Sequence, residues 1–114
     1  DHLYDLTKRL QECIAEDFSK TFNINVIVLR SGHIVDGEKG LDAEGRDLKN
    51  VLYCHGGWVC RYDLARACIK ALQLNKNGYN VYPIIGSWQA KNIFNIERTE
   101  KELGIKFKNT FRKY

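Results

Sequence analysis

The chain has 114 residues, of which 44% are hydrophobic and 28% charged, and its formal net charge is +4 at pH 7. This length suits a single domain over residues 1–114 with one modest core. No apolar run approaches the roughly 20 residues needed to cross a bilayer, and the mild charge gives little support to nucleic-acid binding. We therefore expect a globular protein with neither a membrane nor a nucleic acid as its partner.

The first segments of the chain predict a helix followed by a strand. Residues 2–22 carry apolar side chains at helical spacing with charges between them. These apolar positions are Leu3, Leu6, Leu10, Cys13, Ile14, Phe18 and Phe22. "NVIVLR", residues 25–30, is a continuous branched apolar run, which is typical of a strand covered on both faces in a parallel sheet.

The middle of the chain predicts a long loop, a short strand and a helix. From Ser31 to Gly57 glycine, aspartate and lysine interrupt the pattern, and a short helix is expected near residues 46–52. "GGWVCRYDLARACIKALQL" then predicts a strand and a helix whose N-cap is Asp63. The expected buried stripe of this helix consists of Leu64, Ala67, Cys68, Ala71 and Leu72.

The last segments predict another strand and a closing helix. "YNVYPII", residues 79–85, alternates enough for a strand, and "NIERTEKELG" predicts a helix that Gly104 ends. The order helix, strand, loop, strand, helix, strand, helix indicates an α/β fold with parallel strands.

The four cysteines favour free thiols over a metal site. Cys13, Cys54, Cys60 and Cys68 form no CxxC pair, so buried free thiols are expected rather than zinc ligands. A reducing, cytoplasmic setting fits this interpretation best, although the cysteine count also permits disulfides.

Five segments together resemble a known family. "YDLTK" is similar to a YxxxK motif at the head of a long helix, "VIVLRSGHIVDG" to the strand and loop that follow it, and "WVCRYDLARACIKAL" to an hVxDlAxAxxxAL block. "YNVYPIIGS" and "NIERTEKELGIKFK" correspond to the two closing segments. In this order the chain resembles the C-terminal half of the extended short-chain dehydrogenase/reductase family, of the NAD-dependent epimerase/dehydratase type. "GGWVCRYDLA" is more similar to the uronate-dehydrogenase-like branch than to the nucleotide-sugar epimerases.

The resemblance implies half of a larger fold. The expected architecture is the C-terminal part of a Rossmann-like parallel-sheet fold plus the small substrate-binding portion. The YxxxK helix and its strand would occupy residues 1–30, and the substrate-binding portion residues 31–114. No glycine-rich dinucleotide turn occurs in the chain. The NAD or NADP site is therefore expected to be incomplete, and the chain to be a fragment that is inactive without an N-terminal dinucleotide-binding half. Helix packing in the family implies a homo-oligomer.

The resemblance also implies roles for particular side chains. Tyr4 would be the acid/base on a sugar or nucleotide-sugar hydroxyl during hydride transfer, and Lys8 would favour its phenolate and bind the nicotinamide ribose. Arg30 and Ser31 match the region against the nicotinamide. His33 falls on the substrate-facing loop. Apart from the resemblance, Arg61 and Arg66 are candidate ligands for a substrate carboxylate or phosphate. "SGHIVDG" departs from the family because it lacks the usual tyrosine, glycine and proline.

Simpler interpretations of these residues stay open. Tyr4 and Lys8 also suit an ordinary exposed helix surface, Arg61 suits a solvated helix start, and Trp58 and Trp88 suit core packing better than the wall of a sugar pocket. The alternative functions are a non-catalytic small-molecule-binding or interaction module and a basic nucleic-acid domain, whose binding would weaken steeply with salt.

Overall fold

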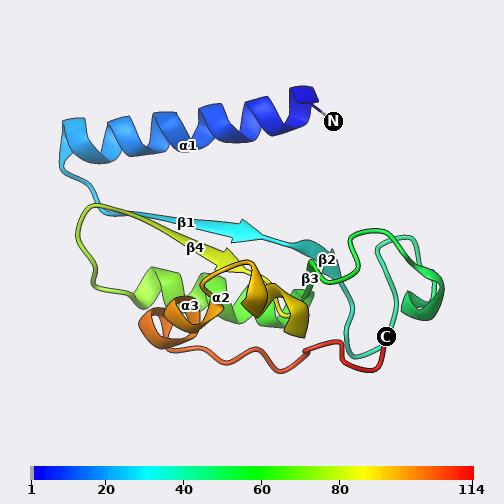
Figure 1. Cartoon of the computed structure of the whole chain (residues 1–114). Coiled ribbons are helices and arrows are strands. Elements are labelled where there is room, and N and C mark those ends of the chain that lie inside the picture. Colours follow the sequence, from blue (N-terminus) through cyan, green and yellow to red (C-terminus); the bar gives the residue numbers. More distant parts are fainter. Residues whose placement is uncertain (1) are drawn as a thin grey trace. The chain divides into compact units, whose positions relative to one another are not determined.

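The computed structural model describes residues 2–114 (Figure 1). The helices are α1 (His2–Phe22), α2 (Arg61–Gln73) and α3 (Ile96–Leu103), with two 3₁₀ helices, η1 (Leu48–Asn50) and η2 (Trp88–Asn92). The strands are β1 (Val26–Ser31), β2 (His33–Val35), β3 (Trp58–Cys60) and β4 (Tyr79–Ile84). The predicted order of helices and strands is confirmed, and β2 is an additional strand inside the predicted loop.

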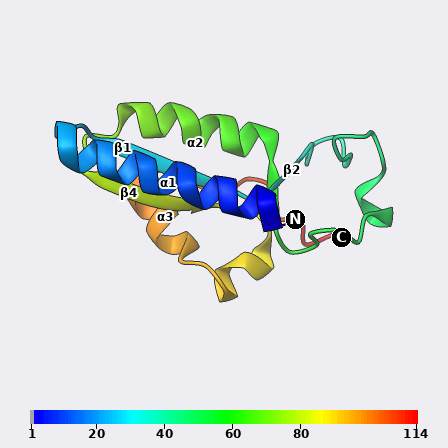
Figure 2. The same ribbon diagram turned by 90° about the horizontal axis from the view of Figure 1, so that it is seen from above.

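The strands form two small parallel pairs. β1 lies beside β4, and their arrows run the same way (Figures 1 and 2). β2 pairs in parallel with β3, so that His33 aligns with Trp58 and Val35 with Cys60. α2 connects β3 of one pair to β4 of the other. The chain is therefore a small α/β protein with parallel strands, as the sequence predicts.

The described residues divide into two compact units. The first contains the chain up to Val28 together with Asn75–Val81. The second contains Leu29–Leu74 and Tyr82–Tyr114. Each unit is described separately below.

In the first unit, local contacts end α1 where the apolar spacing ends. Asn23 has a φ of 51°, a left-handed conformation that asparagine tolerates and that stops a helix. The Ser19 hydroxyl donates to the Ile24 carbonyl at 2.7 Å and so secures the turn out of the helix. The Asn25 side chain then accepts a hydrogen bond from the Gly78 amide at 2.9 Å, which ties the two segments of this unit together.

The apolar side of α1 is exposed to solvent. Six of its side chains have exposed fractions between 43% and 70%: Leu3, Leu6, Leu10, Ile14, Phe18 and Phe22. Burying such a side chain is worth about 1.5–3 kcal/mol, so this side of the helix gains most from a further partner. β1 is also covered less than predicted, because Val26 to Leu29 are half-buried rather than enclosed on both faces.

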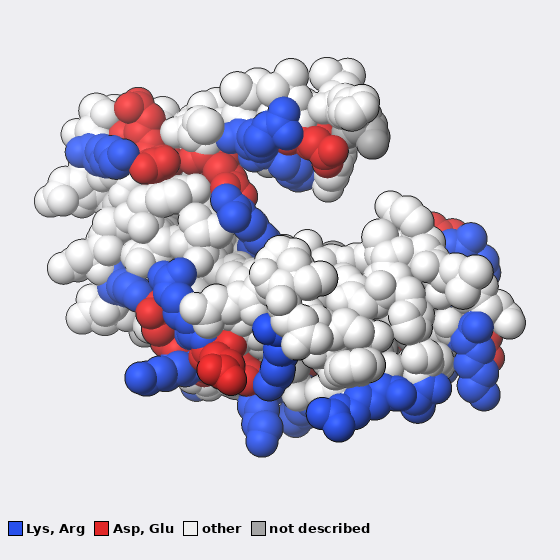
Figure 3. Space-filling model, in the orientation of Figure 1, with Lys and Arg blue, Asp and Glu red and all other residues white. Residues whose placement is uncertain are grey.

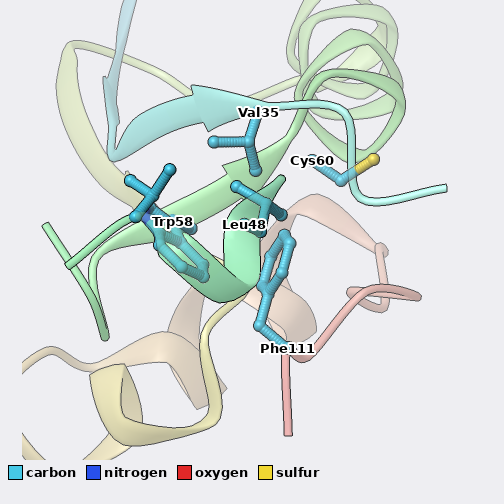
Figure 4. Close-up of a cluster of buried hydrophobic side chains, with 6 residues drawn as sticks. Val35, Leu48, Trp58, Cys60 and Phe111 are labelled. Atoms are coloured by element: carbon cyan, nitrogen blue, oxygen red, sulfur yellow. The ribbon is translucent and has the colours of Figure 1, made fainter. Parts of the chain in front are cut away.

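The core of the second unit is built around Trp58. A buried cluster surrounds it (Figure 4), consisting of Val35, Leu48, Val51, Cys60 and Phe111. The Trp58 indole meets the Phe111 ring edge-on at 5.7 Å and donates to the Tyr53 carbonyl at 3.1 Å. Core packing is thus confirmed for Trp58. For Trp88 it is wrong, because that side chain is 44% exposed and the preceding Ser87 turns inward instead.

The long predicted loop is ordered by two aspartates. The buried Asp42 carboxylate accepts hydrogen bonds from the backbone amides of Glu44 and Arg46 and from the Arg46 guanidinium, at 3.0, 2.7 and 2.5 Å. Asp36 accepts from the amides of Glu38 and Lys39. These turns lead directly into η1, which confirms the short helix predicted near residues 46–52.

These aspartates predict acid sensitivity of the second unit. Burial alone would raise the pKa of Asp42, but hydrogen bonds from Arg46 outweigh it and lower that pKa. The Lys39 amide lowers the pKa of Asp36, with a further contribution from Arg61. A carboxyl whose pKa is lower in the folded state stabilises the fold above its unfolded pKa of about 3.9 and loses this effect as the pH falls further. We expect the urea midpoint to fall between about pH 5 and pH 3, and Asp42→Asn to flatten this dependence. An unchanged fall in that variant would contradict the assignment.

The N-cap of α2 lies three residues before the predicted one. This N-cap is Cys60, and Asp63 lies in the first turn with only 1% of its surface exposed. The predicted stripe is partly wrong, since Ala67 is buried but Cys68 is exposed and Leu72 is 90% exposed. The helix is rotated because it turns Asp63 inward, toward the chain end.

The cysteines and α3 complete the second unit. No disulfide joins the cysteines of residues 2–114, and only Cys60 is buried, so burial was wrongly predicted for the other three. Asn95 caps α3 by accepting from the Arg98 amide at 3.0 Å, and Gly104 ends it with a φ of 66°, as predicted. Among the helices of residues 2–114, none is both long and apolar enough to cross a bilayer.

Candidate functional site

Tyr4 and Lys8 lie one helical turn apart on α1, in the first unit. The Lys8 ammonium is 5.3 Å from the centre of the Tyr4 ring and also donates to the Gln11 side chain at 3.4 Å. Tyr4 is 57% exposed, and Lys8 is exposed as well. The Lys8 ammonium thus makes a cation–π contact with the Tyr4 ring on the helix surface.

Arg30 and Ser31 form the carboxyl end of β1. Both are exposed, and both belong to the second unit. The next residue, Gly32, donates its amide to the Ile84 carbonyl at 3.0 Å, so this end of β1 lies beside the end of β4. In open parallel sheets, ligands bind outside the carboxyl ends of the strands. Arg30 and Ser31 thus lie at the carboxyl end of the paired strands, where a ligand is expected.

His33 opens β2 and contacts an aromatic ring. Its imidazole is half-buried and meets the Tyr53 ring edge-on, with 5.2 Å between ring centres. A hydrogen bond with the Cys54 side chain raises the pKa of Tyr53. The two side chains offer a histidine nitrogen and a phenolic hydroxyl at one surface, which suits hydrogen bonding to a polyhydroxylated ligand.

Arg61 is held by two neighbours at the start of α2. Its guanidinium pairs with Asp36 at 2.8 Å and donates to the Tyr62 hydroxyl at 2.6 Å. The Tyr62 hydroxyl, and after it Asp36, raise the pKa of Arg61. The side chain is still 50% exposed, so it can meet an anion while it links the two strand ends.

Sequence reasoning missed Asp36 as the partner of Arg61. Asp36 directly follows β2, just as Arg61 directly follows β3, so the parallel register brings them together. The available signal was a charged residue at the end of each strand. It was not recognised because residues 31–57 were predicted as one loop without a strand.

The predicted site residues therefore form separate groups. The structure brings Tyr4 next to Lys8 in the first unit, and Arg30 next to Ser31 in the second. His33 and Arg61 are three strand positions apart in the register, or about 10 Å. His33 has Tyr53 beside it and Arg61 has Asp36, rather than each other.

The residues present suit only one end of a dinucleotide. In the first unit, the Lys8 ammonium can donate to a ribose hydroxyl. In the second unit, the Arg30 guanidinium and the Ser31 hydroxyl can donate to a carboxamide. No glycine-rich turn in the described part of the chain leads from a strand into an α-helix, which is the arrangement that holds a pyrophosphate. Within residues 2–114 there is also no group of three or more His, Cys, Asp or Glu side chains arranged to hold a metal ion.

Comparison with known proteins identifies no relative of this chain. No family model matches the chain, and neither the curated proteins nor the solved structures contain a significant match.

Proposed function

We propose that this chain is the catalytic-helix and substrate-binding half of an NAD(P)-dependent sugar or nucleotide-sugar dehydrogenase, epimerase or dehydratase, of the extended short-chain dehydrogenase/reductase type. The observation that carries the proposal is the placement of the Lys8 ammonium 5.3 Å from the Tyr4 ring, one turn along an exposed helix. The parallel pairing of β1 with β4 supports it, because a doubly wound fold is built on parallel strands.

The proposed chemistry assigns each step to a side chain. Tyr4, as the phenolate, accepts the proton of a substrate hydroxyl, and the ammonium of Lys8 stabilises the phenolate. A bound nicotinamide would supply the hydride acceptor, and the hydride would come from the carbon that bears this hydroxyl. Within the second unit, Arg30 and Ser31 would hold the nicotinamide end of a dinucleotide, and His33 and Arg61 would each offer a polar contact to a sugar. The proton and the hydride together account for oxidation of an alcohol to a ketone.

The proposed enzyme needs a second half. A dinucleotide-binding half, cytoplasmic like this chain, provides the glycine-rich turn, the acidic ribose ligand and the serine or threonine of the triad. This half also extends the sheet beside β1. Without it, the chain is expected to bind neither NAD⁺ nor NADP⁺ tightly.

Purification from the native source tests this proposal. The chain is tagged in place, purified with whatever is joined or bound to it, and its intact mass and partners are determined. Reduction of NAD⁺ and NADP⁺ is then followed with uronic acids and nucleotide sugars. We expect a glycine-rich dinucleotide half in the sample and substrate-dependent reduction. A sample without such a half, or one with it that binds no dinucleotide, would falsify the proposal.

A second candidate is a non-catalytic interaction module, which the exposed apolar side of α1 favours. Such a module would keep its partner when Tyr4 is replaced and would show no dinucleotide-dependent activity. The native-source sample separates the two functions, because only the enzyme requires a dinucleotide half.

The same surface predicts self-association of the chain. We expect the purified chain to sediment as a homo-oligomer, and Leu10→Glu with Ile14→Glu to give monomers, because charges on this side oppose burial. Arg9→Glu, an exposed position on the same helix but away from its apolar side, is the matched control and should leave the oligomer intact. Monomeric parent protein in analytical ultracentrifugation would contradict the prediction.

A further inference from the structure

A surface cavity of about 590 Å³ opens between the second half of α2 and the segment that follows α3. Both parts belong to the second unit. Its apolar surface comes from Ile69 on α2 and from Ile105 and Phe107. Ile69 is 55% exposed, so it retains apolar surface that a ligand can cover. The volume lies in the range of roughly 300–1,000 Å³ that small-molecule sites occupy.

Backbone contacts hold the cavity open in the absence of a ligand. Gly104, with its positive φ, turns the chain away from α3. The buried Asp63 carboxylate then accepts hydrogen bonds from the backbone amides of Lys108 and Asn109, at 3.2 and 3.1 Å. Between these points Phe107 is only 6% exposed. The segment is thus fixed by its backbone and by one buried ring, which lowers the entropic cost of binding a ligand.

The charges around the cavity are all positive. Arg66, Lys70, Lys106 and Lys108 line it, and none of the lining residues that the structure describes is acidic. Arg66 is paired with Asp63, but within residues 2–114 the three lysines have no ion pair. Lysine and arginine side chains gather along the side of the second unit where the segment after α3 runs (Figure 3). Ammonium groups beside an apolar surface of low dielectric constant concentrate anions there.

We propose that this cavity binds a small amphiphilic anion, which is a hydrocarbon body with a single carboxylate or phosphate head. The body covers Ile69 and Ile105 above the buried Phe107 ring, and the head pairs with the ammonium groups of Lys106 and Lys108. None of the residues assigned to hydride transfer lines the cavity, so the site is independent of the proposed enzymatic function.

An NMR titration of the isotopically labelled chain tests the proposal. The probes are decanoate and decyl phosphate below their micelle concentrations, with decanol, decyltrimethylammonium and inorganic phosphate as controls. We expect both anionic amphiphiles to shift the amide signals of residues 66–70 and 104–108 in a saturable manner. Decanol and inorganic phosphate should bind about tenfold more weakly, because each supplies only half of the interaction, and the cation should not bind there.

Matched variants separate the two parts of the site. Lys106→Glu with Lys108→Glu should weaken decanoate binding about tenfold or more and leave decanol unaffected. The charge control is Lys39→Glu with Lys49→Glu, which changes two exposed lysines elsewhere in the same unit. It should alter the affinity for neither decanoate nor decanol. Ile69→Ser should weaken both probes, and its melting temperature should equal that of the parent because the side chain is exposed.

Several results would overturn the proposal. If decyltrimethylammonium bound as tightly as decanoate, the charge of the ligand would play no part in binding. Shifts confined to residues 3–22 would place the amphiphile on the apolar side of α1 instead. Binding to anionic phospholipid vesicles without binding of the soluble probes would indicate a membrane surface rather than a small-molecule site.

Discussion

Replacing Tyr4 by phenylalanine is expected to lower kcat for hydride transfer about 100- to 10,000-fold in the assembled enzyme, while substrate and dinucleotide affinities change little. The variant keeps the ring beside Lys8 and removes only the hydroxyl that is proposed to exchange the proton. Loss of a positioned acid/base typically costs this much. Initial rates of nicotinamide reduction over a pH series measure the effect.

Lysine variants on the same helix provide the matched comparison. Lys8→Met should lower kcat and also weaken dinucleotide binding, because this ammonium is proposed to serve both the phenolate and the ribose. Lys20→Met, three turns further along α1, removes a surface pair with Glu16 at 2.7 Å and should leave both parameters unchanged. If Tyr4→Phe retains the parent's kcat, the phenol takes no part in the reaction, and the interaction-module function becomes the better assignment.

Replacing Asp63 by alanine is expected to destabilise the second unit by about 3 kcal/mol. The carboxylate is 1% exposed, pairs with Arg66, and accepts the amides of Lys108 and Asn109. Its removal leaves two backbone amides and a guanidinium without their acceptor, and each unsatisfied buried group costs roughly 1–3 kcal/mol. Urea unfolding followed by the fluorescence of the buried Trp58 measures the change.

The conservative variants make this prediction specific. Asp63→Asn keeps one acceptor oxygen and should lose less stability than alanine, whereas Arg66→Met should lose less again, because the two amides still bind the carboxylate. Asp47→Ala removes an exposed cap of η1 and serves as a control that should cost about 1 kcal/mol. A loss in Asp63→Ala no greater than in this control would show that the chain end is held by its apolar contacts alone.

Local sequence patterns located the helices and strands well. The three-four spacing of residues 2–22 marked α1, and Gly104 marked the end of α3, because both signals act within a few residues of the chain. β2 escaped detection since a three-residue strand carries too little periodicity to stand out among glycines and aspartates.

The sequence by itself determined the α/β class, the helix and strand positions, and the spacing of Tyr4 and Lys8, because these depend on propensities, caps and helical geometry within single segments. Only the tertiary structure decided that Asp63 faces inward, that three cysteines are exposed, that Asp36 pairs with Arg61, and that lysines from two distant segments surround one cavity. Each of these features depends on contacts between residues far apart in the chain, whose free energies outweigh the local pattern.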